Sequence, residues 1–357
     1  MKIALILPSL GNLGPVIVAN ELVNGLRGNS DVSHIHVYYF DEKEKNDTLH
    51  FPCTTEKISF FQKLDLSAYS IIHSHGIRPD LFLARQRILN RQLKIVTTVH
   101  CYIYPELAQT YNKLIALITT PLWLMSLQPF NKVVFLVNDM KEHYSRYFRR
   151  RQLAYVHNYR SVDQVNSYTL SEKETNEVLA FKDGYTLLGT ICKLTKRKGV
   201  HQLIELLCVE PHYKLIIIGD GKEQANLEAL ARTKGVSDRV FFTGYKKHAV
   251  AFLPLMDVFC LSSNSEGFGL VLLEAALHEK SIVCTDLPSF RELFSEQEVA
   301  FFKYGNIQSL QNAIVWAVAE SEILGSRARK KTLVTYNQEN FIQGYLKVYK
   351  DLTNQSA

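Results

Sequence analysis

Short apolar runs alternate with amphipathic segments along the whole of this 357-residue chain. In the first half, strand-length runs rich in Val, Ile and Leu recur as KIALILP, IHVYYF, SIIHSH, KIVTTVH and KVVFLVN. The second half repeats the pattern with YTLLGTIC, YKLIIIGDG, RVFFTGY, VFCLSS and SIVCTD. Strands that are apolar throughout are typical of parallel sheets covered by helices on both faces. The pattern therefore predicts an α/β protein with two Rossmann-like, doubly wound parallel sheets in series.

Amphipathic segments of helical length separate these strands at residues 16–26, 200–207, 223–234 and 307–319. Because one hydrophobic core serves no more than roughly 250–300 residues, two domains are expected. We predict an N-terminal domain of residues 1–160 and a C-terminal domain of residues 161–337, joined near 159–165. A last helix at 338–357 is predicted to pack back on the first domain. Such sheets bind ligands at the carboxyl ends of their strands, so we expect a cleft between the domains.

The composition, 46% hydrophobic and 21% charged, is that of a folded soluble protein. The formal net charge of +6 is uneven, since residues 1–160 hold 19 Lys and Arg against 12 Asp and Glu, and the remainder holds 22 against 23. A basic half suits an anionic lipid surface or a phosphorylated substrate, or serves solubility alone. No fingerprint of nucleic-acid binding accompanies the charge, so nucleic acid is not a predicted partner.

The six cysteines lack any C-x-x-C pair and have mostly apolar neighbours, which is typical of reduced core thiols in a cytosolic protein. The first apolar run is too short for a signal peptide. The longest one, residues 114–127, falls short of the roughly 20 residues that cross a bilayer. We expect a cytoplasmic protein, with attachment to the inner face of the cell membrane left open.

Two glutamates flank a glycine turn in SSNSEGFGLVLLEA, which follows a predicted strand and opens a helix. Backbone N–H groups at a helix N-terminus bind phosphate or sugar oxygens, and glycine lets a ligand approach them closely. Glu274, about one turn into the helix, is suited to the two hydroxyls of a ribose. Glu266, before the turn, is suited to a hexose hydroxyl. The alternative is an exposed loop carboxylate on an ordinary amphipathic helix.

The loop in GTICKLTKRKGV carries four cations after a predicted strand. Cations in such a loop can neutralise a departing diphosphate. Lys193 and Lys198, which bracket the loop, are the candidates for that role. We interpret Lys196 and Arg197 as solvated surface residues.

Two further glycine loops follow predicted strands. Gly219 in LIIIGDGKEQ belongs to a G-x-G, but Gln224 stands where a dinucleotide fingerprint has its third glycine. This argues against a nicotinamide enzyme. Gly11 and Gly14, after the first strand, either allow close approach of a phosphate or sugar or form a plain tight turn, with Pro15 at the first helical position.

Three histidines end strands of the first domain, namely His73, His75 and His100. At the mouth of a cleft, a histidine can donate to a sugar hydroxyl or sense a phosphate. A purely structural role stays open for His73. The sequence has no D-x-D motif and no carboxylate-rich cluster, so we predict no metal site.

Together these motifs resemble those of the retaining glycosyltransferases of family four, which share the GT-B fold. SEGFGLVLLE resembles their E-x7-E motif, GTICKLTKRKG their G-R-L strand end with a following K-G, and LIIIGDG their G-x-G strand. VFFTGY is similar to their F-x-G turn and TTVH to their first-domain histidine strand. The likeness extends over nearly the whole chain and is most specific in residues 240–285.

The resemblance implies that the second domain binds a nucleotide diphospho-sugar of the UDP or GDP type, as a substrate, and that no cofactor is needed. It implies that Glu274 contacts the ribose and Glu266 the donor sugar. The backbone of Phe268, Gly269 and Leu270 would lie beside the sugar and phosphate.

The resemblance also implies roles for residues of the other loops. They are Lys193 and Lys198 on the pyrophosphate, Gly14, Gly219 and Gly244 at the nucleotide, and His100 near the transferred sugar. Two positions depart from the family pattern. Lys193 stands where arginine is usual, so a point charge replaces a bidentate contact. Gly11 and Gly14 replace the usual adjacent glycine pair.

The chemistry implied by the resemblance is hexosyl or N-acetylhexosaminyl transfer with retention of the anomeric configuration and without a metal ion. Fixed cations and helix N-termini would stabilise the charge that develops on the diphosphate. No nucleophile for a double displacement is evident, so we favour attack from the face of the leaving group, with the phosphate accepting the proton. Glu266 is then a positioning candidate.

The first domain is expected to meet a saccharide acceptor, which a lipid anchor would hold in bacterial surface polysaccharide synthesis, such as that of O-antigen, capsule or exopolysaccharide. Residues 114–130 are apolar, and RYFRRRQ adds four arginines, a pairing that suits anionic lipid. Core packing and an ordinary surface are the alternatives. A nucleotide-sugar epimerase of the same fold and an inactive sugar-nucleotide-binding subunit are the rival functions.

Overall fold

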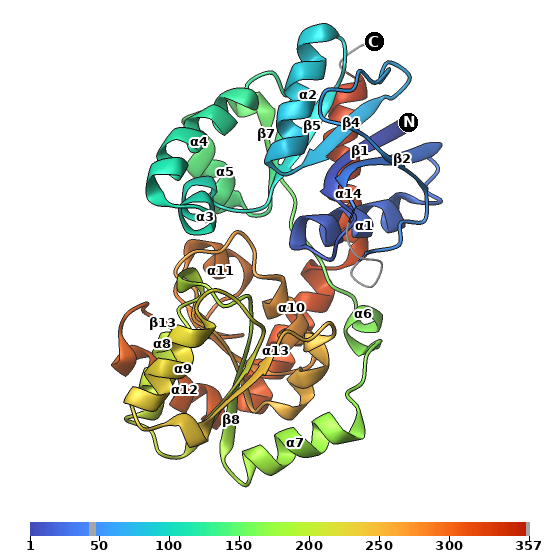
Figure 1. Ribbon diagram of the computed structural model, residues 1–357. Helices are drawn as coiled ribbons and strands as arrows, with labels where there is room; N and C mark the ends of the chain where they lie inside the picture. The colour runs from blue at the N-terminus through green and yellow to red at the C-terminus, as the bar shows by residue number, and fades with distance from the viewer. Residues whose placement is uncertain (43–47, 355–357) are drawn as a thin grey trace. The chain divides into compact units, whose positions relative to one another are not determined.

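The computed structural model describes residues 1–42 and 48–354. The chain folds into two units. The first comprises Met1–Asn158 and the C-terminal segment from Gln338, and the second comprises Tyr159–Asn337 (Figure 1). The predicted boundary at residue 160 lies within two residues of this division.

The first unit is built on a seven-stranded parallel sheet with the order β3-β2-β1-β4-β5-β6-β7. Its strands are β1 (Lys2–Ser9), β2 (His34–Asp41), β3 (Thr54–Lys57), β4 (Ile71–His75), β5 (Ile95–Val99), β6 (Lys132–Phe135) and β7 (Leu153–Tyr155). Its helices are α1 (Gly14–Leu26), α2 (Ile77–Leu89), α3 (Ile103–Thr110), α4 (Lys113–Ser126), α5 (Asn138–Tyr144), the 3-10 turn η2 (Arg150–Gln152) and α14 (Gln338–Thr353).

The second unit has a six-stranded parallel sheet with the order β10-β9-β8-β11-β12-β13. Its strands are β8 (Thr186–Ile191), β9 (Tyr213–Ile218), β10 (Val240–Gly244), β11 (Val258–Leu261), β12 (Ser281–Thr285) and β13 (Ala300–Phe302). Its helices are α6 (Val162–Asn166), α7 (Glu172–Lys182), α8 (His201–Leu207), α9 (Gln224–Thr233), α10 (Leu270–Leu277), α11 (Pro288–Leu293), α12 (Ile307–Ala319) and α13 (Ser321–Thr335), with 3-10 turns η3 (Lys196–Lys198), η4 (Ser237–Arg239) and η5 (Ala249–Leu255).

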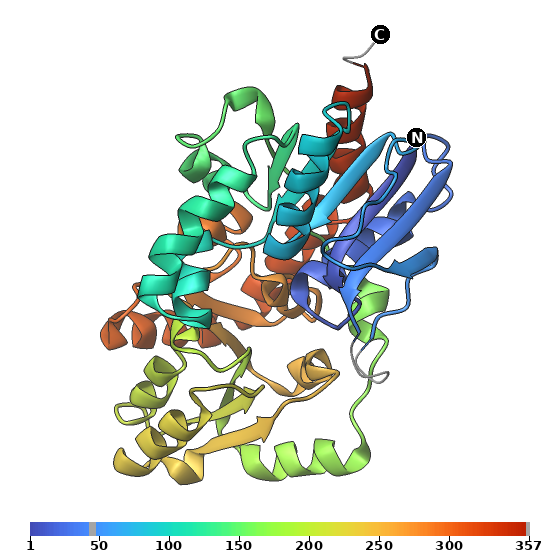
Figure 2. The same cartoon turned by 45° about the horizontal axis from the view of Figure 1, so that its top comes forward.

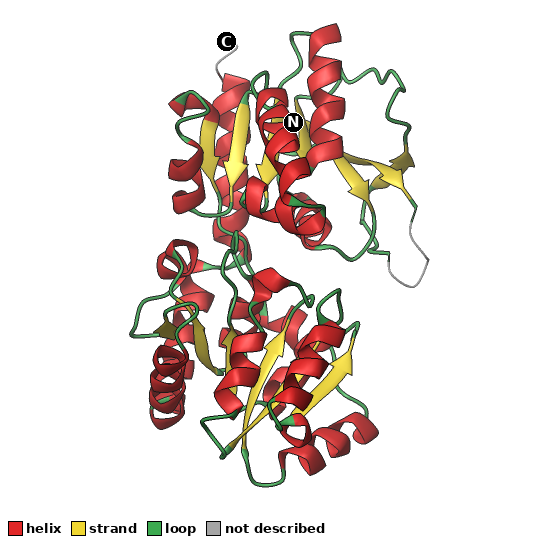
Figure 3. Ribbon diagram, turned by 60° about the vertical axis from the view of Figure 1, so that its left-hand side comes forward, coloured by secondary structure: helices red, strands yellow, loops and turns green. Residues whose placement is uncertain are grey.

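The apolar runs predicted all the central strands and the edge strand β10. Every residue of β4, β5, β11 and β12 is buried, as expected for strands covered on both faces (Figure 3). The apolar pattern missed β3, β7 and β13. All three are edge strands of three or four residues, and β3 is exposed at each of its positions. Three or four residues are too few to form a recognisable apolar run, and β3 in addition buries none of its side chains.

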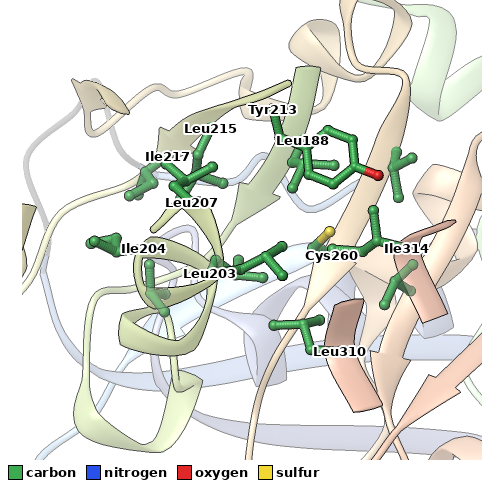
Figure 4. Packing of buried hydrophobic residues seen from close by; sticks show 14 of the residues in the cluster. Leu188, Leu203, Ile204, Leu207, Tyr213, Leu215, Ile217, Cys260, Leu310 and Ile314 are labelled. Atoms are coloured by element: carbon green, nitrogen blue, oxygen red, sulfur yellow. The ribbon is translucent and has the colours of Figure 1, made fainter. Parts of the chain in front are cut away.

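One hydrophobic cluster of the second unit lies between its sheet and helices that include α8 and α12. Leu203, Ile204 and Leu207 of α8 pack against strand residues such as Leu215 and Ile217 (Figure 4). From α12, Leu310 and Ile314 join the same cluster. This packing fixes the loops that leave the carboxyl ends of β8 and β11.

Helix α14 belongs to the first unit, although it comes last in the sequence (Figure 2). It crosses α1 at Gly25, where an added Cβ would lie 2.3 Å from Ile342. Its Tyr345 and Tyr349 are fully buried. The close crossing therefore depends on a glycine in α1, and two aromatic side chains anchor the helix.

Some smaller expectations require correction. Helix α1 begins at Gly14, so Pro15 is the second helical residue. Of the cysteines, Cys260 and Cys284 are core thiols, whereas Cys208 is exposed. Within the described part of the chain, no helix combines the length and apolar character needed to cross a membrane.

Candidate functional site

The candidate residues of the second unit lie in loops after adjacent strands. Strand β8 pairs with β9 on one side and with β11 on the other, so the strand order reverses at β8. At such a point the two flanking loops diverge and leave room for a ligand at the carboxyl edge of the sheet. The loop after β8 carries Lys193 and Lys198, and the loop after β11 carries Glu266.

Glu266 is buried at 8% exposure, and three polar side chains surround its carboxylate. Lys198 Nζ donates to Oε1, and Ser263 Oγ donates to the same oxygen at 2.8 Å. Arg197 approaches Oε2 at 3.1 Å and also donates to the carbonyl oxygen of Ser265 at 2.7 Å. We call Glu266, Lys198 and Arg197 the ion cluster. The structure thus brings together two predicted residues and adds a third.

The ion cluster keeps Glu266 ionised. Burial alone would raise the pKa of Glu266, but the charges of Lys198 and Arg197, with hydrogen bonds from Lys198 and Ser263, outweigh it and lower the pKa to about 2. At neutral pH the group is therefore a carboxylate that accepts hydrogen bonds. It holds no proton to donate as a general acid.

The interpretation of Arg197 as a solvated surface residue is wrong. Its side chain is only 16% exposed because it pairs with Glu266. The sequence does not show which of the four neighbouring cations points inward, because this depends on the 3-10 turn η3. Lys193 and Lys196, in contrast, are exposed.

Backbone contacts hold the two loops together. Asn264 N donates to the carbonyl oxygen of Arg197 at 2.8 Å, and Ser262 Oγ donates to that of Lys198 at 2.9 Å. Gly199 ends η3 at φ 61°, and an added Cβ would lie 2.2 Å from the carbonyl oxygen of Ser262. Only glycine fits this close, left-handed position. The position of Lys198 relative to Glu266 is therefore fixed by the backbone.

Glu274, the second glutamate of the motif, lies in α10 and pairs with Arg160. The Arg160 Nε atom donates to Oε1 of Glu274 at 2.8 Å, and the two side chains are 9% and 20% exposed. Arg160 falls in the segment that the sequence suggested as a linker, so nothing in the pattern pointed to it. The pairing orients the Glu274 carboxylate and leaves it partly accessible.

In the turn between the two glutamates, the Phe268 side chain is buried, whereas the two residues that follow it are partly exposed. Phe268 is buried at 2% exposure and packs edge-on against Tyr336, with ring centroids 6.1 Å apart. Gly269 is the N-cap of α10 at φ 80°, and an added Cβ would lie 2.9 Å from the ring of Phe290. Gly269 and Leu270 are partly exposed. The Phe268 ring is thus closed to a ligand, whereas Gly269 and Leu270 remain partly accessible.

Gly219 and Gly244, predicted at the nucleotide, contact each other. Gly219 N donates to Gly244 O at 2.9 Å. An added Cβ on Gly219 would lie 2.0 Å from the carbonyl oxygen of Cys192, and one on Gly221 would lie 2.2 Å from that of Leu194. The two glycines of the G-x-G are therefore needed for packing, because the loop after β8 passes too close to them for a Cβ.

In the first unit, Gly14 opens α1 and has open space around the position of a Cβ. His73 is a fully satisfied core residue: Nδ1 lies 2.8 Å from the Tyr349 hydroxyl and Nε2 lies 2.9 Å from the Thr98 hydroxyl. Burial, with a smaller contribution from His100, lowers the pKa of His73 to about 3. The structural role left open for His73 is the one that this geometry supports.

His75 and His100 form a pair, with 2.9 Å between Nδ1 of His75 and Nε2 of His100. Burial lowers the pKa of His100 to about 3 and that of His75 well below its usual value, so both rings are neutral at physiological pH. Nε2 of His75 is buried and has no hydrogen-bond partner among the described residues. A buried N–H without an acceptor costs more free energy than a buried lone pair without a donor. The proton of His75 therefore lies on Nδ1. His100 therefore accepts at Nε2 and carries its own proton on Nδ1.

The side chains in the described ranges, 1–42 and 48–354, include no cluster of three or more His, Cys, Asp or Glu residues able to hold a metal ion. The arrangement of the second unit instead provides a fixed carboxylate, cations and exposed backbone groups around one strand-order reversal.

Comparison with known proteins places this geometry in a family. The model of "Glycosyl transferases group 1" matches residues 171–332. The O-antigen biosynthesis glycosyltransferase WclY of Escherichia coli is 30% identical over 325 residues, which cover 89% of each chain. The chain belongs to the group 1 glycosyltransferases. This confirms the coarser part of the resemblance seen in the sequence.

Two further comparisons bear on this group 1 glycosyltransferase. The structure of Anabaena Alr3699/HepE in complex with UDP and glucose superposes with a TM-score of 0.80 at 18% identity, over 98% of this chain and all of that one. The predicted GT-B fold, with two Rossmann-like parallel-sheet units, is confirmed. A Campylobacter jejuni relative, 31% identical over 124 residues, spans 34% of this chain and 33% of its own. Its name describes transfer of N-acetylgalactosamine to a diphospho-undecaprenol-linked saccharide.

Proposed function

We propose that this glycosyltransferase moves a hexosyl or N-acetylhexosaminyl group from a UDP- or GDP-sugar to a saccharide acceptor, with retention and without a metal ion. The observation that carries the proposal is the ion cluster. Replacing a buried ion cluster by well-packed apolar residues is often neutral or stabilising, so stability alone does not explain why a protein has one, although breaking an existing cluster is costly. Such a cluster beside a strand-order reversal is instead typical of a functional site.

The ion cluster supplies the charges that the reaction needs. As the bond between sugar and phosphate breaks, negative charge grows on the diphosphate, and fixed cations stabilise it without reorganising. Lys198 takes this role, and Glu266 holds it in place. Lys193, exposed on the same loop, supplies a second cation.

Retention follows from attack on the face that the diphosphate leaves. Oε1 of Glu266 already accepts from Lys198 and Ser263, and Oε2 faces Arg197. Three of the roughly four acceptor sites of the carboxylate are engaged in this way, which makes it a poor nucleophile and argues against a covalent glycosyl intermediate, while one site is left for a sugar hydroxyl. The departing phosphate oxygen instead accepts the proton of the acceptor hydroxyl, and Glu266 serves as a positioning residue for the donor sugar.

The remaining predicted residues complete the proposed donor site. Glu274, oriented by Arg160, accepts hydrogen bonds from the ribose hydroxyls. The backbone of Phe268, Gly269 and Leu270 contacts the sugar and phosphate. Gly14 and His100 of the first unit take part at the phosphates and the transferred sugar, respectively.

The acceptor is proposed to be a lipid-linked saccharide in the synthesis of a bacterial surface polysaccharide. The names of the E. coli and C. jejuni relatives support this assignment, since one specifies O-antigen biosynthesis and the other a diphospho-undecaprenol acceptor. The site of action would then be the cytoplasmic face of the cell membrane.

Donor binding tests the proposal directly. Isothermal titration of the purified protein with UDP, GDP and their sugars is expected to identify one nucleotide that binds, and Glu274→Ala should weaken that binding about tenfold or more, the order of a lost pair of hydrogen bonds to a charged group. Lys196→Ala, at an exposed cation outside the ion cluster, is the matched control. Unchanged affinity in Glu274→Ala would remove Glu274 from the site. Failure of every nucleotide sugar to bind or react would overturn the proposed function.

A further inference from the structure

Helix α4 (Figure 1) belongs to the first unit, and large apolar side chains are exposed along its whole length. We call these side chains the outer face of α4. They are Leu114 (74% exposed), Ile115 (40%), Leu117 (65%), Ile118 (63%), Leu122 (55%) and Met125 (67%). Contiguous apolar patches on soluble proteins are usually interaction sites.

The outer face is continuous around the helix. At 3.6 residues per turn, its six side chains and the exposed Pro121 fall within one arc of about 160°. The opposite side is apolar as well, with Ala116, Trp123 and Leu124 buried. A helix that is apolar on both sides normally has partners on both. Among the described residues, the outer face of α4 has none that buries it.

The inner side of α4 is anchored by a polar contact that the sequence did not reveal. Trp123 Nε1 donates to Oδ2 of the buried Asp80 at 2.8 Å. The other oxygen of Asp80 accepts from Ser74 at 2.6 Å and from Thr97 at 2.7 Å. These bonds tie α4 to α2, β4 and β5 and fix its rotation. The outward direction of the apolar side chains is therefore set by the core of the unit.

Helix α4 carries no acidic residue of its own, and a cation borders its outer face. The sequence contains no Asp or Glu between Leu107 and Asn138. Arg146 shares a cavity of about 490 Å³ with Leu117 and Pro121. Positive charge thus lies directly beside the apolar arc.

A second cationic cavity, of about 580 Å³, lies where the chain leaves α4. Arg87, Lys132, Arg149 and Arg151 line it, and the described lining residues include no carboxylate. Lys132 also lies 4.0 Å from Asp351. The segment of residues 146–152, which carries four arginines, is held against the end of α4. The side-chain amide of Gln128 donates to the carbonyl oxygen of Tyr147 in this segment at 2.9 Å.

We propose that the outer face of α4 docks on the surface of an anionic lipid bilayer. The apolar side chains would enter the boundary between head groups and acyl chains, and the arginines would meet lipid phosphates. With 14 residues, α4 measures only about 21 Å, so it lies on a bilayer and does not cross one. This docking rests on the proposed function in one respect. A lipid-linked acceptor is the reason for the protein to be at a membrane.

A second copy of the chain is the competing occupant, and the charges argue against it. A two-fold interface brings the same patch of both copies together. The arginines beside α4 would then face their own counterparts, and α4 itself carries no acidic residue to pair with them. An anionic bilayer offers the complementary charge.

Vesicle co-sedimentation of the full chain, without sugar nucleotide, tests the proposal. Phosphatidylcholine vesicles that contain phosphatidylglycerol are expected to bind the protein, and pure phosphatidylcholine vesicles to bind it far less. The double variant I118S/M125S should lower partitioning about tenfold or more through lost apolar insertion. Neutralising Arg149, Arg150 and Arg151 to Gln should cost roughly fivefold per residue and abolish most of the salt dependence.

Matched controls come from α13, which also exposes apolar and cationic side chains. L333S/V334S and R327Q/K330Q change the same chemistry on the second unit and should leave binding unchanged. Thermal unfolding checks that each variant folds. Nucleotide-sugar affinity, measured in parallel, should be the same in all of them, so a failure of the proposed function would show there and not in the vesicle assay.

Three results would overturn the proposal. One is equal binding to neutral and anionic vesicles, and another is binding that I118S/M125S leaves intact. The third is a wild-type dimer in sedimentation velocity that this variant converts to a monomer, which would assign the face to a second copy.

Discussion

At the scale of single residues, charge outweighs burial at Glu266. The carboxylate is almost fully buried, which by itself would favour the protonated acid. Lys198 and Arg197 reverse this preference and bring the pKa to about 2. A group whose pKa is depressed on folding stabilises the folded state above its unfolded pKa and loses that contribution as the pH falls.

The pH dependence of a Glu266→Gln variant tests this balance. A drop from 4.5 to about 2 corresponds to about 3 kcal/mol of unfolding free energy at neutral pH. The contribution is present above about pH 4.5 and disappears as the pH approaches 2. Urea unfolding should therefore show a large difference between wild type and variant at pH 7 and a smaller one near pH 3. The exposed Glu322→Gln serves as control, and an equal difference at both pH values would contradict the ion cluster.

The histidine pair makes a second prediction at this scale. If His75 donates from Nδ1, the neutral His100 carries its proton on Nδ1, and it stays neutral well below pH 6. Nitrogen-15 NMR of the histidine rings distinguishes the two tautomers. We expect the Nδ1–H form of His100 between pH 8 and 5, and His75→Leu should shift it toward Nε2–H. A His100 signal that titrates near 6.5 would show that the pair is not closed.

At the scale of elements, short backbone contacts between loops decide the geometry of the site. Gly199 permits the left-handed end of η3 and the approach of the β11 loop. Gly14 starts α1 in open space and has no such constraint. The two glycines look alike in the sequence but differ in what surrounds them.

This contrast predicts opposite outcomes for the same substitution. Gly199→Ala should destabilise the protein by about 2 kcal/mol or more, since alanine is strained at this φ and its Cβ meets a backbone oxygen. Gly14→Ala should leave stability unchanged or slightly raised, because alanine favours a helix. Thermal unfolding measures both. If Gly14→Ala folds normally but binds donor more weakly, close approach of the phosphates explains the glycine; equal stability of both variants would refute the constraint at Gly199.

At the scale of the whole molecule, the two units provide separate reporters of ligand binding. The proposed nucleotide contacts are concentrated in the second unit, Tyr159–Asn337. A nucleotide at 100 times its dissociation constant adds roughly 2.7 kcal/mol to the stability of the state that binds it. Thermal unfolding with UDP and with GDP should therefore raise the transition of this unit for one of the two nucleotides. A nucleotide that stabilised only the unit containing Met1–Asn158 would contradict the assignment of the donor site.

The fold class, the central strands and the glycine turn between Glu266 and Glu274 could be predicted from the sequence alone. Buried parallel strands must be apolar on both faces, so their pattern is legible without coordinates. The edge strand β3 escaped because it is short and buries none of its side chains.

Only the tertiary structure decided which cation reaches Glu266, that Arg160 holds Glu274, and that Asp80 anchors the inner side of α4. These contacts join residues that are 43 to 114 positions apart. The loops and packing that bring them together depend on the whole fold, and local residue types carry no record of such distant partners. The direction in which α4 presents its apolar side chains was undecided in the sequence for the same reason.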